Sequence, residues 1–228
     1  MRHIRELISL AEADHPKDHF FANLDQTLIA FSEARAQYRA YERALSRLDP
    51  ESWAELRAKA IAHFVDHRRG QLKQGFFNQL NEAFAYQYLI RRGYRHVRVL
   101  REVGKTQPDI EYLDGDERKF CEVKTIGISE ELIARRDTSQ CFHASIYSEL
   151  STGFVNKLKS TLDVAHRQIN ACGTNGLIYV IVLFDDFTLA NYGKYRKQVW
   201  TCVKAHTAEN VYVKVGLLGQ RHIRKGFQ

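Results

Sequence analysis

The chain has 228 residues, of which 44% are hydrophobic and 27% are charged, and its formal net charge at pH 7 is +7. It is too apolar to be disordered, and it is long enough for one large domain or a small domain with an appendage. The isoelectric point near 9.2 suits a polyanionic partner, although a merely soluble basic protein explains the charge equally well. The longest apolar run, residues 177–184, is too short to span a bilayer, and residues 1–6 do not resemble a signal peptide. We therefore expect a soluble cytoplasmic protein with no membrane partner.

Residues 4–69 are expected to be helical throughout. Apolar residues recur from Leu24 to Leu48 at spacings of three and four, which predicts one apolar stripe on a long helix. Asp49 and Pro50 are expected to end that helix and to start the next one, as its N-cap and first helical residue. We expect the stripe to pack inside the protomer, and a homodimer seam is the alternative.

Short strands follow a further helix that is expected to begin near Gly75 and to end at Gly93. The elements expected after it are strands over 97–103, 109–113 and 119–124, a helix over 150–170, a buried strand over 176–184, a helix over 191–206 and a last strand over 210–218. This order predicts an α/β fold with a mixed central sheet flanked by helices. It also predicts a domain boundary that separates a helical N-terminal extension, residues 1–70, from a domain over residues 71–228.

The most informative residues lie in two neighbouring strands of this sheet. Asp109 opens the first, and Glu122-Val123-Lys124 ends the second, with a turn rich in Asp and Gly between the strands. Residues two apart in a strand share a face, so Glu122 and Lys124 point to one side and Cys121 points to the other, into the core. In a hairpin Asp109 and Glu122 converge beside Lys124. Two carboxylates and one ammonium group can hold a hard divalent cation next to an activated water.

This pattern resembles the PD-(D/E)xK nuclease superfamily, in which Pro108-Asp109 and Glu122-Val123-Lys124 match the two halves of the signature. The resemblance covers about residues 72–218 and implies a restriction-endonuclease-like core that hydrolyses DNA with magnesium, or with manganese as a substitute. It implies that Asp109 and Glu122 ligate the metal and that Lys124 orients the water or steadies the developing charge. The Val123 carbonyl is a candidate third ligand. An acidic residue on the preceding helix often completes the pattern, and Glu82 is placed to be that metal-binding and catalytic residue.

Two polar residues on the helix over 150–170 are candidate nucleic-acid contacts, because the family often binds the phosphate backbone there. They are Lys157 and Gln168. Simpler alternatives exist for the whole set: Asp109 as a turn cap, Glu122 and Lys124 as an ion pair on a solvated face, and Glu82 as an ordinary solvated glutamate. Taken together the residues favour a nuclease. A catalytically silent nucleic-acid-binding protein of the same fold and a nuclease directed at RNA are the alternatives.

Other hydrolase sites find no support in the sequence. The chain has no HExxH spacing and no nucleophile elbow, which argues against a zinc hydrolase and a serine hydrolase. Its four cysteines are scattered without metal-ligand spacing, and we expect isolated reduced thiols.

Overall fold

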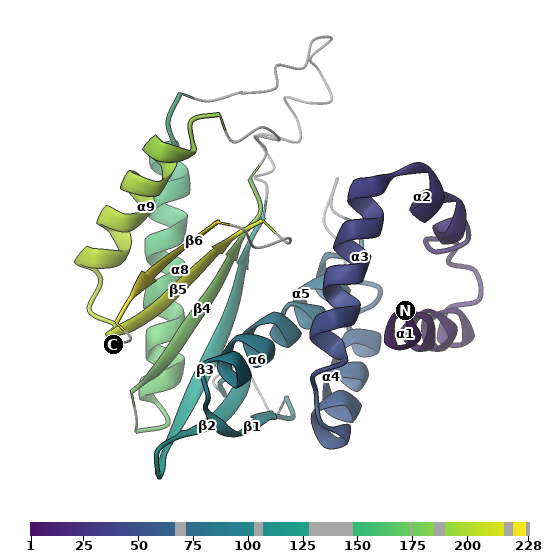
Figure 1. The fold of residues 1–228 in the computed structure, drawn as a ribbon, viewed down its shortest axis with the longest axis horizontal. Helices are drawn as coiled ribbons and strands as arrows, with labels where there is room; N and C mark the ends of the chain where they lie inside the picture. Colours follow the sequence, from purple (N-terminus) through teal and green to yellow (C-terminus); the bar gives the residue numbers. More distant parts are fainter. Residues whose placement is uncertain are drawn as a thin grey trace. The chain divides into compact units, whose positions relative to one another are not determined.

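The computed structural model describes residues 1–66, 72–102, 107–127, 148–173, 175–184, 190–216 and 221–226. It has a mixed α/β fold with a six-stranded mixed sheet, in which the strand order is β1-β2-β3-β4-β5-β6 (Figure 1). The chain divides into two compact units. The first unit comprises Met1–Val103 and Asp109–Glu117, and the second comprises Gly104–Pro108 and Arg118–Gln228.

The first unit packs its helices around an aromatic core. The rings of Phe21, Phe64 and Phe76 meet with their centroids 5.5 to 6.0 Å apart, which favours edge-to-face and offset contacts. The unit continues past the boundary that the sequence predicts after residue 70, and that boundary stays a prediction. Its elements are α1 (Arg2–Asp14), α2 (Leu24–Ala30), α3 (Ser32–Leu45), α4 (Pro50–Ala62), α5 (Gln74–Leu80), α6 (Glu82–Arg91) and the antiparallel strands β1 (Arg95–Val99) and β2 (Ile110–Asp114).

The single long helix predicted from Leu24 to Leu48 is wrong. The backbone at Phe31 is extended, with φ −117° and ψ 106°, so α2 ends before it and α3 begins after it. Leu28 and Leu45 are buried as the stripe requires, but Phe31 is 62% exposed. A spacing of three and four fits two consecutive helices almost as well as one, because only one residue leaves the helical conformation.

The start of α4 is confirmed, and it links three elements of the first unit. Asp49 caps the helix by accepting a hydrogen bond from the Ser52 backbone N–H at 2.9 Å, and Pro50 is the first helical residue. The other Asp49 oxygen accepts from the Tyr86 hydroxyl of α6 at 2.9 Å. The Ser52 hydroxyl oxygen accepts from the Val99 N–H of β1 at 3.1 Å. This network holds α4 against α6 and β1.

The second unit is a sheet with two helices. Strands β3, β4 and β5 run parallel, and β6 pairs antiparallel with β5. Strand β6 was not expected from the sequence, because its five residues follow the expected last strand closely and only one of them is apolar. The elements are β3 (Glu117–Ile126, whose first residue belongs to the first unit), α8 (Thr152–Asn170), β4 (Gly176–Val182), α9 (Tyr192–Ala205), β5 (Asn210–Val215) and β6 (Arg221–Lys225).

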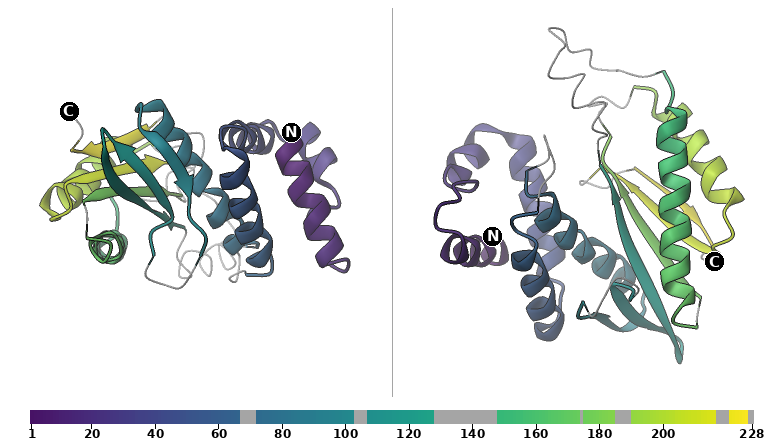
Figure 2. Two further views of the ribbon diagram at one scale, coloured as in Figure 1. Left: turned by 90° about the horizontal axis from the view of Figure 1, so that it is seen from below. Right: turned by 180° about the vertical axis from the view of Figure 1, so that it is seen from behind.

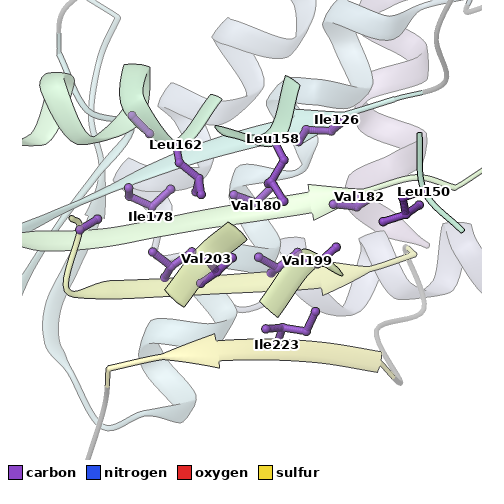
Figure 3. Close-up of a cluster of buried hydrophobic side chains, with 14 of the residues drawn as sticks. Ile126, Leu150, Leu158, Leu162, Ile178, Val180, Val182, Val199, Val203 and Ile223 are labelled. Carbon is purple, nitrogen blue, oxygen red and sulfur yellow. The ribbon is translucent and has the colours of Figure 1, made fainter. Parts of the chain in front are cut away.

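The core of this unit lies between one face of the strands and the helices α8 and α9 (Figure 2). The buried residues of α8, which include Leu158 and Leu162, recur at the helical spacing and form one stripe. This stripe packs against Ile178 and Val180 of β4 (Figure 3). Gly176 starts β4 so close to β3 that a Cβ atom there would collide with the Phe120 carbonyl oxygen. Glycine at this position therefore permits the β3–β4 register.

This core makes a direct stability prediction. Leu162 is fully buried and Val164, on the same helix, is 40% exposed. We expect Leu162→Ala to lower the free energy of unfolding by about 2–5 kcal/mol, because it removes buried apolar volume and leaves a cavity. Val164→Ala is the matched control and should change that free energy by less than about 0.5 kcal/mol. Urea titration of both variants measures the difference, and equal losses would contradict the assigned core.

Candidate functional site

Glu122 and Lys124 share a buried face of β3. In the parallel register Glu122 pairs with Ile178 and Lys124 with Val180, and paired residues of neighbouring strands point to the same side. Ile178 and Val180 belong to the core beneath α8 and α9. Glu122 is accordingly only 2% exposed. The interpretation of Glu122 and Lys124 as an ion pair on a solvated face does not fit this burial.

The two side chains contact each other directly. The Lys124 ammonium group donates a hydrogen bond to Glu122 Oε1 at 2.5 Å, while the Lys124 side chain itself remains 27% exposed. A carboxylate in an apolar layer is costly unless a charge or several hydrogen bonds compensate it. Lys124 provides that charge and keeps an exposed surface. Cys121 is fully buried on the opposite face, as predicted, and Val123 is half-buried between the two site residues.

A second buried carboxylate–lysine pair lies in the first unit. Glu82 is the first residue of α6 and is 3% exposed. The ammonium group of Lys59, from α4, donates to both of its carboxylate oxygens at 3.2 and 3.0 Å. The interpretation of Glu82 as a solvated glutamate is therefore wrong, because its carboxylate is buried and bonded to Lys59. Lys59 was not expected from the sequence, although a signal was present: it follows Leu56 by three residues, on the apolar side of α4.

Asp109 belongs to the same electrostatic group as Lys59 and Glu82. It directly precedes β2, is half-buried, and accepts a hydrogen bond at its backbone oxygen from the Leu100 N–H at 2.8 Å. Burial opposes the charged form of Lys59 and would lower its pKa, but the negative charges of Glu82, Asp109 and Glu102 outweigh burial and raise that pKa above its usual value.

The predicted site residues thus form two groups. Glu82 and Asp109 lie in the first unit with Lys59, and Glu122, Val123 and Lys124 lie in the second. The convergence of Asp109 with Glu122 stays a prediction. Within the residues that the structure describes, no three His, Cys, Asp or Glu side chains are grouped to hold a metal ion. Carboxylate oxygens nevertheless fit magnesium, which keeps several waters and needs few protein ligands.

The two candidate nucleic-acid contacts lie on α8. Lys157 is exposed and Gln168 is half-buried. Eleven residues separate them, which is close to three helical turns, so they lie on one side of the helix about 16 Å apart along its axis. That side flanks the buried stripe of α8.

Comparison of the chain with protein-family models, curated proteins and solved structures finds no match. Over the described residues, no helix combines the length and the apolar character that crossing a membrane requires. The assignment of a function therefore depends on the residues and their geometry.

The Lys59–Glu82 pair predicts a non-additive stability effect. Lys59→Met leaves the Glu82 carboxylate buried without its ammonium partner, which should lower the free energy of unfolding by about 3–5 kcal/mol. Adding Glu82→Gln to that variant removes the stranded charge and should recover part of the loss. Lys159→Met is the control for an exposed lysine, since Lys159 lies on the outer surface of α8. Guanidinium titration of the parent, Lys59→Met, the double variant and Lys159→Met measures these stabilities. A double variant less stable than Lys59→Met would contradict the predicted recovery.

The same pair sets a pH dependence. The pKa of Lys59 is raised on folding, so its stabilising contribution is fully present below the ordinary lysine value of 10.5 and is lost as the pH rises through the higher folded value. The stability difference between the parent and Lys59→Met should therefore stay constant from neutral pH to about pH 10 and shrink as the pH rises above 10.5. A difference that already declines near neutral pH would show that the charge of Lys59 is not what stabilises the fold.

Proposed function

We propose that this protein is a magnesium-dependent nuclease that hydrolyses DNA phosphodiester bonds. The observation that carries the proposal is the buried Glu122 in contact with Lys124 on β3, because this pair forms the most specific part of the acidic-x-Lys signature. A buried carboxylate with a half-buried lysine two residues later is an unusual feature for stability alone. The resemblance to the PD-(D/E)xK superfamily supplies the reaction type.

The chain's own groups suit phosphodiester hydrolysis. Asp109 and Glu122 would be ligands of one ion, with the Val123 carbonyl as a third and Glu82 as a further acidic group. Bound magnesium would supply positive charge to a phosphate oxygen and lower the pKa of a water. Lys124 is held beside Glu122 and would stabilise the negative charge that develops on the phosphate, or orient the attacking water. Lys59 would hold Glu82 in its buried position.

DNA is the substrate that we propose, and RNA is the alternative. Hydrolysis of a phosphodiester requires the protein to hold neighbouring phosphates, and Lys157 and Gln168 lie on one side of α8, where they would contact the backbone. The formal net charge of +7 favours any polyanion. These features favour a polyanionic substrate and do not distinguish DNA from RNA.

One observation favours a second function, a nucleic-acid-binding protein without cleavage. Each buried glutamate of the candidate site already has an ammonium partner, Lys59 for Glu82 and Lys124 for Glu122. These partners compensate the buried negative charge without any help from a metal ion. The two functions differ in whether the bound DNA is cut.

The nuclease proposal predicts metal-dependent cleavage that requires Glu122. Plasmid, linear duplex, branched and single-stranded substrates should be tested with magnesium, with manganese and with EDTA. Cleavage should appear with either metal and vanish in EDTA and in Glu122→Gln, because both remove the cation. Glu117→Gln, at the exposed end of the same strand, should retain it. Undiminished cutting in EDTA would rule out the mechanism, and binding without cutting of any substrate would favour the second function.

Lys124 is predicted to act on the transition state and not on the metal. Lys124→Ala should slow single-turnover cleavage at least about a hundredfold, the scale for losing a positioned charge, with DNA affinity nearly retained. Lys119→Ala removes a lysine from the opposite face of β3 and should cleave at a rate close to the parent. Equal rates for Lys124→Ala and the parent would reduce Lys124 to a structural partner of Glu122.

A further inference from the structure

A basic surface lies away from β3, on α9 and β6 of the second unit. Neither α9 nor β6 contains an Asp or a Glu. Surface helices usually alternate the two signs of charge, so a helix and a strand without any acidic residue form an unusual pair. Their seven cationic residues are Lys194, Arg196, Lys197 and Lys204 of α9 and Arg221, Arg224 and Lys225 of β6.

These seven residues account for the whole net charge of the protein. Removing them from the 34 Lys and Arg leaves 27, which equals the number of Asp and Glu in the chain. The rest of the chain is therefore neutral in sum, and the excess positive charge is concentrated on two elements. A protein that is basic only for solubility has no need to gather its charge in this way.

The helix and the strand are neighbours at the edge of the sheet, and we call their combined outer surface the α9–β6 surface. Ile223 points into the core beside α9, so His222 and Arg224 lie on the other face of β6 and the charges extend around this edge. Helix α9 packs against β6 in the second unit, as the two lie side by side in Figure 1. The Arg221 guanidinium group stacks over the Tyr192 ring at the start of α9, 4.5 Å from its centroid. Burial is the main cause of the lowered pKa of His222 on β6, and the charges of Arg224 and Arg196 lower it further. The positive field thus extends from α9 across β6.

Aromatic side chains are interleaved with these charges. His222 stacks on Tyr212 with centroids 5.6 Å apart and an interplanar angle of 17°, and Arg224 lies over the same tyrosine. On α9, Trp200 is 40% exposed and follows Lys197 by three residues and precedes Lys204 by four, so the three share one side of the helix. Tyr212 is buried and supports Arg224 from beneath, whereas Trp200 is exposed among the lysines of α9. Lys and Arg clustered on one part of a domain are the electrostatic footprint of a surface that tracks a nucleic-acid backbone.

We propose that the α9–β6 surface binds the phosphate backbone of DNA. Basic residues on an edge strand such as β6 also discourage strand pairing between molecules, but that role does not require four more cations on α9. Binding at this surface needs no metal and no cleavage, so it goes beyond the proposed nuclease activity. The bound backbone would be held by charge, with no base contacts and little sequence preference.

The test compares two triple variants that remove the same charge from different places. Arg196→Gln/Lys197→Gln/Arg224→Gln removes three of the seven charges of the α9–β6 surface, and Arg39→Gln/Arg43→Gln/Arg47→Gln removes three exposed arginines on and just after α3. Fluorescence anisotropy with a short labelled duplex in EDTA measures binding without cleavage, over a series of salt concentrations. Circular dichroism of both variants establishes that they are folded.

The surface variant should bind DNA at least about tenfold more weakly than the parent. The magnitude of the slope of log affinity against log salt should fall by up to about 0.9 for each phosphate that the variant no longer binds. The α3 variant should stay within about twofold of the parent, since its arginines bind no phosphate. Arg196→Lys/Arg224→Lys keeps the charges and should bind like the parent, which separates the effect of charge from an effect on folding. Equal weakening in both triple variants would overturn the proposal in favour of net charge. DNA binding by the surface variant that equals binding by the parent would also overturn the proposal. If that variant instead lost affinity for vesicles of anionic phospholipid, the surface would bind a membrane and not DNA.

Discussion

A buried carboxylate in contact with a lysine is the interaction on which this structure depends. It occurs twice among the described residues, as Glu82 with Lys59 between two helices and as Glu122 with Lys124 within one strand. In each case the apolar surroundings make the negative charge costly, and an ammonium group within hydrogen-bond distance offsets that cost. Such a pair is weak evidence for stability, because well-packed apolar residues would serve as well. The occurrence of such a pair in both units motivates the proposal that the carboxylates bind a metal ion.

Sheet register and helix packing create these two environments. In the second unit, the close approach at Gly176 sets β4 beside β3, and the stripe of α8 buries the face that Glu122 shares with Ile178. In the first unit, the cap of α4 bonds to α6 and β1, which places Lys59 opposite Glu82. The charges on α9 and β6 differ from these buried pairs in their exposure to solvent. They are largely solvated, so they act over a longer range and are screened by salt.

The sequence predicts the parts that local rules decide. Strand alternation placed Glu122 and Lys124 on one face and Cys121 on the other, and the helix cap at Asp49 was correct. Sequence reasoning failed where tertiary packing decides. Spacing could not detect the single extended residue at Phe31, and alternation could not tell that the face of Glu122 is buried as well as the face of Cys121. Lys59 was missed because its partner comes from another helix, 23 residues later in the chain.

The central proposal is that Asp109 and Glu122 ligate one cation, and calorimetric titration of magnesium and manganese tests it most directly. The parent, Asp109→Asn, Glu122→Gln and the double variant should be titrated in parallel. Each single variant should lose at least about tenfold in metal affinity, and the double variant should lose less than the product of the two, because both substitutions act on the same ion. Losses that multiply independently, or an affinity that neither substitution changes, would contradict the shared site.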